Sequence, residues 1–224
     1  MQGSPLRFDD GVRFTDVVYV KSKFALVTGT SSGIGDAVAR RLLDTGWHVL
    51  GVARRDAPIR NTNYEHCAVD LGDTSLLMRV LEPRLTVLLA GASWSRVGLV
   101  NNAAHAGLLG PIDRLDVGEF PAVLATNVVA PVWLMKQFLA RTPRVTPLRI
   151  VNVSTAAAVH GFAGLGGYGS SKAALRMAGM VLAAELQEAQ SRGEEHRDIA
   201  ILSFEPGTVD TPMQENARTS SRET

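Results

Sequence analysis

The sequence predicts a doubly wound α/β fold, a parallel sheet with helices on both faces. Short apolar runs typical of buried strands alternate with helical patterns from residue 23 onward. A glycine-rich turn joins the first strand to the first helix, as in a strand–helix–strand unit with a right-handed crossover. The chain's polar and glycine-containing motifs directly follow strands. In such sheets ligands bind outside the carboxyl ends of the strands.

Composition indicates one globular domain of balanced charge. The chain has 224 residues, 46% of them hydrophobic, which suffices for a sizeable core. Its net charge of +1 argues against a nucleic-acid or acidic partner. Cys67 is the only cysteine and the histidines are scattered, so we expect no disulfide, no metal and a reducing cytoplasm. No uncharged apolar run of about 18 residues occurs, so we also expect no membrane span.

The domain boundaries follow from the same pattern. Residues 1–22 lack the basic-then-apolar layout of a signal peptide, and we interpret them as an N-terminal extension. Residues 23–214 should form the folded domain, and residues 215–224 a C-terminal tail.

The opening unit is expected as a strand at residues 23–28, a helical pattern that ends at Gly46, and a second strand at residues 47–53. Pro83 should weaken the second helix and Pro131 should bend the third. Further strands are expected at residues 65–69, 96–100, 148–153 and 199–204, and helices at 73–89, 119–140 and 168–190.

The glycine turn runs Thr28-Gly-Thr-Ser-Ser-Gly-Ile-Gly35. Glycines let the backbone approach a phosphate closely, and a helix that begins near Gly33 directs free amides and its positive dipole end at the charge. The spacing differs from the commoner Gly-x-Gly-x-x-Gly pattern, and a turn without a ligand is the alternative. Its place after the first strand favours a dinucleotide.

At the end of the second strand, an acidic residue would bind a ribose 2′-hydroxyl, but the chain has Arg54 and Arg55. A guanidinium can grip a 2′-phosphate, which favours NADP(H) over NAD(H). The alternatives are that these are ordinary surface arginines, or that Asp56 reaches the ribose.

Polar residues also follow the third and fourth strands. Asp70 could accept a hydrogen bond from adenine or cap the next helix, a role that Asp73 should fill first. Asn101 and Asn102 could bond the turn or contact a ribose. Asn127 lies in an apolar helix and needs a polar partner nearby, and a purely structural hydrogen bond is one possibility.

Tyr168 and Lys172 should lie one turn apart on the same helix face. A nearby ammonium favours the phenolate and lowers the tyrosine pKa, as proton transfer near neutral pH requires. A hydroxyl upstream, at Thr155 or Ser154, could hold the oxygen that is protonated. The alternative is an ordinary helical pair.

Four motifs in order resemble the short-chain dehydrogenase/reductase family over roughly residues 23–214: the glycine turn, Asn101-Asn-Ala, Tyr168-x-x-x-Lys172 and Pro206-Gly-x-Val-x-Thr211. Residues 207–214 are similar to its sepiapterin reductase and benzil reductase branch. The resemblance implies a Rossmann-type three-layer α/β/α fold.

The resemblance also implies roles for individual residues. Tyr168 would be the general acid, Lys172 would lower its pKa and bond the nicotinamide ribose, Thr155 would stand in for the family's serine, and Asn127 would hold a relay water. The expected contacts of NADP(H) are Gly29, Ser31, Ser32, Gly33, Ile34, Gly35, Arg54, Arg55, Asp70, Leu71, Asn102, Ala103, Tyr168, Lys172, Pro206, Gly207, Val209 and Thr211.

Three departures from the family pattern are Thr155 for serine, Ala104 for the last glycine of Asn-Asn-Ala-Gly, and a chain that ends where the family continues with a further helix and a seventh strand. We therefore expect six strands. The implied function is NADPH-dependent reduction of a ketone or aldehyde, and the alternative is an NADP(H)-binding protein that senses the cofactor or serves a partner. Small residues on the last long helix suit a homodimer or close packing on the sheet.

Overall fold

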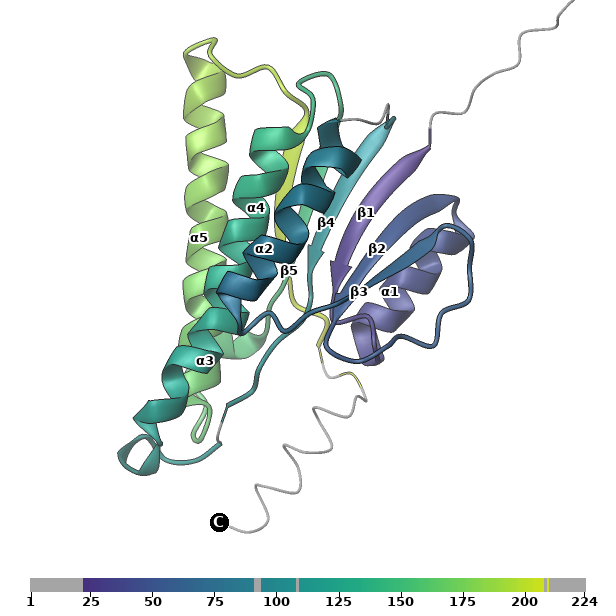
Figure 1. Ribbon diagram of the computed structural model, residues 1–224. Coiled ribbons are helices and arrows are strands. Elements are labelled where there is room, and N and C mark those ends of the chain that lie inside the picture. Colours follow the sequence, from purple (N-terminus) through teal and green to yellow (C-terminus); the bar gives the residue numbers. More distant parts are fainter. Residues whose placement is uncertain (1–21, 91–93, 108, 208, 210–224) are drawn as a thin grey trace, which may run out of the picture.

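The computed structural model describes residues 22–90, 94–107, 109–207 and 209. Within these residues, six parallel strands form one sheet in the order β3-β2-β1-β4-β5-β6, which confirms the expected fold (Figure 1). The strands are β1 Lys23–Thr28, β2 Trp47–Ala53, β3 Tyr64–Ala68, β4 Arg96–Asn101, β5 Leu148–Val153 and β6 Ile199–Phe204.

Helix α1 covers one face of the sheet, and α2, α4 and α5 lie together against the other (Figure 1). The α-helices are α1 Gly33–Asp44, α2 Thr74–Leu85, α3 Phe120–Leu124, α4 Ala130–Arg141 and α5 Gly166–Ser191. Single π-turns lie at η1 Thr86–Ala90 and η4 Ala125–Val129, and short 3₁₀ turns at η2 Ile112–Arg114, η3 Val117–Glu119 and η5 Ala156–Ala158. The third strand lies one residue earlier than expected, and the last helix begins two residues earlier.

Alternate residues of the central strands enter two separate cores. Leu26 of β1 packs in the larger core together with Phe138 of α4, while the next residue, Val27, packs against Ala39 and Leu43 of α1. Because both faces are covered here, the strand reads as a continuous apolar run. These packed layers hold the carboxyl ends of the strands, and the loops that follow them, along one edge.

The helical stretch around Pro131 contains a π-turn immediately before the proline. Pro131 has no N–H to donate to the carbonyl of Asn127 four residues earlier, and the π-turn η4 contains Asn127. Among the described residues, one helical segment, residues 117–141, is long and apolar enough by length and composition alone to cross a membrane, with a mean hydropathy of 1.4 over an 18-residue window. The uncharged part of this segment lies between Glu119 and Lys136 and is shorter than 18 residues, and the core helix of a soluble protein has the same composition, so the expectation of no membrane span stays a prediction. In the fold this segment packs on the sheet through the fully buried Leu134 and Phe138.

Candidate functional site

The glycine turn after β1 requires glycine at its key positions. Gly29 and Gly33 have φ of +77° and +61°, the left-handed region in which side chains are strained. A Cβ on Gly35 would lie 2.2 Å from the carbonyl oxygen of Gly29 and 2.5 Å from Nδ2 of Asn102. The turn is thus packed closely against the loop that follows β4.

Thr28 and Asn102 fasten the turn to that loop. The hydroxyl of Thr28 accepts hydrogen bonds from the backbone N–H of Asn102 at 2.9 Å and of Ala103 at 3.0 Å. Nδ2 of Asn102 donates to the carbonyl of Thr28 at 2.9 Å. Of the two roles open to Asn102, the structure contains the turn bond.

The start of α1 fits a phosphate group. Ser32 is its N-cap residue, and its side chain makes no capping hydrogen bond. Within the described residues, neither Ser31 nor Ser32 uses its hydroxyl in another hydrogen bond, and Ile34 follows in the first turn. The first amides of the helix therefore lack side-chain acceptors at the end where its dipole favours an anion.

A positive group lies at the end of β2, close to the end of β3. Nη1 of Arg54 is 3.7 Å from Oδ2 of Asp70, and the Arg54 side chain is 70% exposed. Oδ1 of Asp70 accepts from the N–H of Gly72 at 2.8 Å, while Asp73 caps α2 by accepting from Leu76, as expected. Arg55 is exposed beside them, and Asp56 instead faces His66 at 3.8 Å.

Leu71 is buried at the carboxyl end of β3. The exposed guanidinium of Arg54, paired with Asp70, can receive the phosphorylated ribose of an adenine nucleotide at this edge.

Tyr168 and Lys172 lie in the first two turns of α5. Nζ of Lys172 is 5.9 Å from the centre of the Tyr168 ring, and it donates to the carbonyl of Val153 at 2.7 Å. Lys172 is 2% exposed, and burial lowers its pKa to about 8. The pair expected from the spacing is therefore present on one helix face, beside the end of β5.

The expected lowering of the Tyr168 pKa is not found in the structure. Burial raises the pKa of Tyr168, because the phenolate loses hydration. The ammonium of Lys172 is directed at Val153 rather than at the phenol oxygen, which explains why spacing alone misjudged the direction.

Asn127 uses its whole side chain to join two segments. Its Nδ2 donates to the carbonyl of His105 at 2.8 Å and to the hydroxyl of Ser171 at 2.9 Å, and its Oδ1 accepts from the N–H of His105 at 2.7 Å. Ser171 in turn donates to the carbonyl of Tyr168 at 2.7 Å. The polar partners required for Asn127 are thus His105 and Ser171, which the sequence did not single out because neither carries a motif of its own.

The two hydroxyls after β5 differ in their surroundings. Thr155 caps the short turn η5, and its Oγ1 accepts from the N–H of Ala157 over a long 3.4 Å. Ser154 is buried, and its Oγ has no hydrogen-bond partner among the described residues. Thr155 is the more exposed of the two and can release its bond at low cost.

The loop after β6 completes the same edge of the sheet. Pro206, Gly207 and Val209 follow the strand, and Gly207 has a φ of +72°. Thr211 lies outside the described residues. Ala104, where a glycine was expected, is partly buried in the loop after β4.

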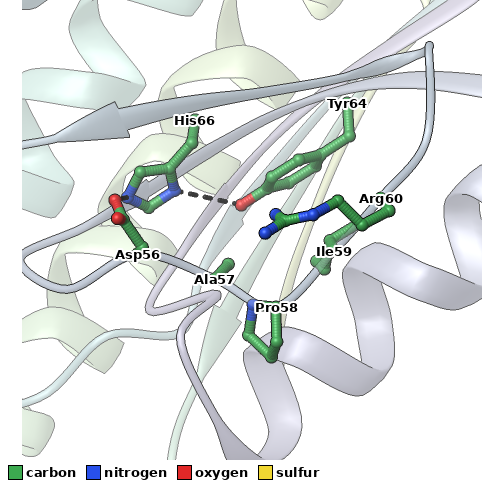
Figure 2. A pocket seen from close by; sticks show the side chains of 7 residues that line it. All are labelled: Asp56, Ala57, Pro58, Ile59, Arg60, Tyr64 and His66. Carbon is green, nitrogen blue, oxygen red and sulfur yellow. Dashed lines mark hydrogen bonds and ion pairs between the residues drawn. The ribbon is translucent and has the colours of Figure 1, made fainter.

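A hollow of about 650 Å³ lies beside the connection from β2 to β3 rather than over Tyr168 (Figure 2). The chemistry that the motifs indicate concerns the carboxyl edge, so we place the candidate site there and treat the hollow separately. In the described part of the chain, no three histidine, cysteine, aspartate or glutamate residues are grouped to hold a metal ion.

Comparisons with known proteins show which family the chain and its fold resemble. The family model for short chain dehydrogenases matches residues 23–222. A benzil reductase ((S)-benzoin forming) from Bacillus cereus is 28% identical over 90% of this chain and 81% of its own length. A sepiapterin reductase from Meriones unguiculatus is 32% identical over 88% of this chain and 78% of its own length.

Among solved structures, a short-chain dehydrogenase/reductase from Burkholderia vietnamiensis superposes with a TM-score of 0.70, at 30% identity and with 90% of each chain covered. The glycine turn and the Tyr168–Lys172 pair lie at the same edge of a sheet with the expected strand order. Together with the family-model match, this arrangement identifies the chain as a member of the short-chain dehydrogenase/reductase family, whose oxidoreductases work with a nicotinamide cofactor.

Proposed function

We propose that the protein is an NADPH-dependent carbonyl reductase that acts on a ketone or an aldehyde. The observation that carries the proposal is the position of Tyr168 and Lys172 beside the end of β5, on the same sheet edge as the glycine turn. A proton donor and a dinucleotide site on one edge suit hydride transfer coupled to protonation of an oxygen.

Bound NADPH supplies the hydride to the carbonyl carbon. Tyr168 donates its proton to the carbonyl oxygen, and burial keeps this phenol protonated at neutral pH, as the acid in a reduction must be. The ammonium of Lys172, near the ring, then stabilises the phenolate. Thr155 exchanges its long bond to Ala157 for one to the substrate oxygen.

Asn127 contributes through its backbone in this proposal. Its side-chain amide is occupied by His105 and Ser171, and Pro131 cannot donate to its carbonyl oxygen. That carbonyl is the group that can hold a water for resupply of the proton.

NADPH is the proposed cofactor because Arg54 and Arg55 lie at the end of β2, where a carboxylate would otherwise repel a 2′-phosphate. The names of the relatives, a benzil reductase and a sepiapterin reductase, suggest diketones and pteridines as first substrates. The test is NADPH oxidation with these compounds. Tyr168→Phe should lower kcat by about 10²- to 10⁴-fold while NADPH still binds, and unchanged turnover in this variant would refute the assignment.

A second candidate is an NADP(H)-binding protein without useful turnover. The bond from Ala157 to the Thr155 hydroxyl favours it, because that hydroxyl is engaged by the protein's own backbone. Tight NADPH binding in calorimetry, with no turnover on any carbonyl tested, would support this candidate, and a measurable reductase rate would eliminate it.

We also propose a cytoplasmic homodimer built on α5. Met177, Met180 and Val181 are about half exposed on its outer side. Of the small residues on this helix, Gly179 packs closely against Asn152, whereas others remain exposed at the surface. A second copy would cover the exposed methionines. A monomeric mass in solution scattering would contradict the dimer.

A further inference from the structure

The connection from β2 to β3 contains no helix. It spans residues 54–63, whereas parallel strands are usually joined by a dozen or more residues that include a helix. Ala57 and Ile59 turn inward and join the core between α1 and the sheet. This short connection leaves the outer side of Tyr64 facing the hollow, which Arg60 and His66 also line (Figure 2).

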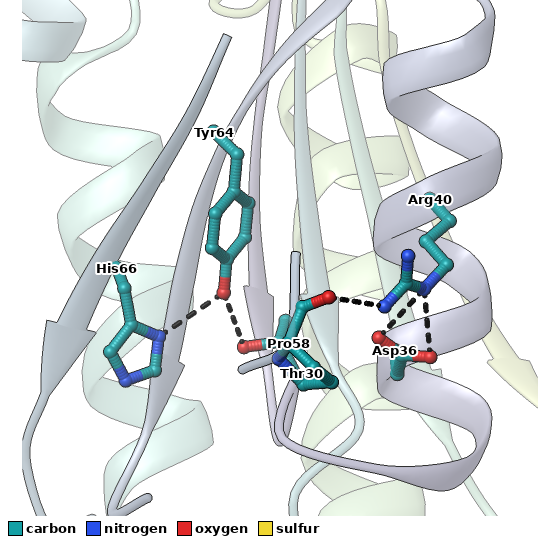
Figure 3. A network of polar contacts seen from close by, with 6 residues as sticks. All are labelled: Thr30, Asp36, Arg40, Pro58, Tyr64 and His66. Carbon is teal, nitrogen blue, oxygen red and sulfur yellow. Dashed lines mark hydrogen bonds and ion pairs between the residues drawn. The ribbon is translucent and has the colours of Figure 1, made fainter. Parts of the chain in front are cut away.

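Tyr64 reaches from the start of β3 across β2 to the glycine turn. Its hydroxyl lies 3.0 Å from Oγ1 of Thr30 and 3.1 Å from Nδ1 of His66 (Figure 3). Thr30 is fully buried in the turn between Gly29 and Ser31. The absence of a side chain at Gly51 leaves room for this contact, because a Cβ there would lie 2.1 Å from the Tyr64 hydroxyl oxygen and 2.6 Å from Oγ1 of Thr30.

The connection itself is tied to α1. Nη2 of Arg40 donates to the carbonyl of Pro58 at 2.8 Å, and its Nε pairs with Asp36 in the first turn of the helix at 3.0 Å (Figure 3). The connection, the start of α1 and the glycine turn are therefore held as one unit.

We infer that Tyr64 is a positioning residue for the dinucleotide: through Thr30 it fixes the glycine turn that receives the pyrophosphate. The side chain of Ser32 does not cap the helix after the turn. The hydrogen bond between the Tyr64 and Thr30 hydroxyls joins the turn to the β2–β3 side, opposite the contact between Thr28 and Asn102. Displacing a binding group by a fraction of an ångström weakens a charged contact that depends on geometry. The ring of Tyr64 packs over Gly51 and against the core beside α1 but borders the hollow on its outer side, so its hydroxyl bonds contribute to fixing where it lies.

The inference rests on the proposed cofactor binding, and it makes a distinct claim. The pyrophosphate is common to NADPH and NADH, so loss of the Tyr64–Thr30 hydrogen bond should lower the affinity for both cofactors by the same factor. Loss of a residue that contacts the 2′-phosphate would instead lower the affinity for NADPH alone.

The test is titration of the full chain with NADPH and with NADH. Tyr64→Phe and Thr30→Val should each raise both Kd values about 3- to 10-fold, as expected for one hydrogen bond. The double variant should be no worse than the weaker-binding single variant, because both lose the same bond. Thr30→Ser should bind nearly as wild type, and Thr62→Val, an exposed threonine of the same connection, is the matched control.

Steady-state kinetics separates positioning from simple loss of stability. In Tyr64→Phe, KM for NADPH should rise while kcat stays within about twofold of wild type. Unchanged Kd values in Tyr64→Phe, or additive effects in the double variant, would overturn the inference and leave the proposed function standing. A wild-type chain that binds neither cofactor would overturn both, and one that binds only NADH would overturn the NADPH proposal alone.

Discussion

Lys172 donates a hydrogen bond from Nζ to the carbonyl oxygen of Val153, which fastens α5 to the end of β5 just before Thr155. The lysine is 2% exposed, and burial lowers its pKa to about 8. No carboxylate among residues 22–90, 94–107, 109–207 and 209 pairs with Lys172, and a buried cation of this kind opposes folding because it has lost its hydration. Its presence beside Tyr168 is understandable if the protein needs a positive charge there for catalysis.

The variant Lys172→Met should be more stable than the native protein at pH 7, by about 1 to 3 kcal/mol, because removing a buried cation outweighs the loss of its hydrogen bond to Val153. Below pH 8 the folded and unfolded forms of the native protein both hold the lysine proton, and the full cost of burial is present. Between pH 8 and the ordinary value of 10.5, only the unfolded chain holds it, so the free energy of unfolding of the native protein rises with pH.

Urea unfolding of both proteins at several pH values measures this difference. The difference in the free energy of unfolding between Lys172→Met and the native protein should decrease as the pH rises from 8 to 10.5. The same difference should be absent for Lys136→Met, which replaces an exposed lysine on α4. A gap that stays constant with pH would show that the charge of Lys172 is not its cause.

Much of the fold was predictable because its signals are local. The strands at residues 23–28, 47–53, 148–153 and 199–204 are apolar runs bounded by glycine, proline or polar residues, and the structure has them at the expected bounds. Asp73 as the cap of α2 was predictable for the same reason. Pro131 indicates that the helix is disturbed near this point, but the form of the disturbance, a π-turn that contains Asn127, depends on how the segment packs against the sheet.

The contacts of the site were less predictable, because they join residues far apart in the chain. The direction of the Tyr168 pKa depends on burial, which the spacing to Lys172 does not reveal. The apolar surroundings of Asn127 in the sequence indicate that it needs a polar partner, but nothing in the sequence points to His105 or Ser171 as that partner. Tyr64 looks like an ordinary strand aromatic, and only the fold brings its hydroxyl to Thr30.

Removing the Asn127 side chain should destabilise the protein and loosen the site together. Asn127→Ala loses hydrogen bonds to both His105 and Ser171 and leaves buried polar groups unpaired, so the free energy of unfolding should fall by about 2 to 4 kcal/mol. Ser171→Ala should cost about 1 kcal/mol. Asn61→Ala, an exposed asparagine with one local bond, serves as the control in denaturant unfolding. Equal free energies of unfolding for Asn127→Ala and Asn61→Ala would contradict the role of Asn127 in joining the segments of His105 and Ser171.

Gly35 should tolerate no side chain. In Gly35→Ala the new Cβ would lie 2.2 Å from the carbonyl oxygen of Gly29, so the glycine turn must open. NADPH affinity should fall more than about tenfold, since the phosphate-binding amides move with the turn. Gly161→Ala, where a Cβ would meet no atom within 4 Å, is the matched control. Calorimetric titration of both variants measures the effect, and wild-type affinity in Gly35→Ala would mean that the cofactor does not use this turn.

Arg54 should select the cofactor without supporting the fold. Its ion pair with Asp70 spans 3.7 Å and is 70% exposed on the arginine side, so its loss should change the free energy of unfolding by less than about 0.5 kcal/mol. Charge-assisted bonds from its guanidinium to the 2′-phosphate should nevertheless make NADPH binding about 10- to 100-fold weaker in Arg54→Ala. NADH affinity should stay as in the wild type, because NADH lacks that phosphate.

The matched control for this prediction is Arg79→Ala, an exposed arginine on α2 that should alter neither affinity. Kd values for both cofactors, measured on each variant, give the ratio of NADPH to NADH affinity. That ratio should fall in Arg54→Ala alone, because only this change removes a cation from the end of β2. If the affinities for both cofactors fall equally, Arg54 contacts the part of the dinucleotide that NADPH and NADH share. The preference for NADPH must then come from Arg55 or from another residue at this edge.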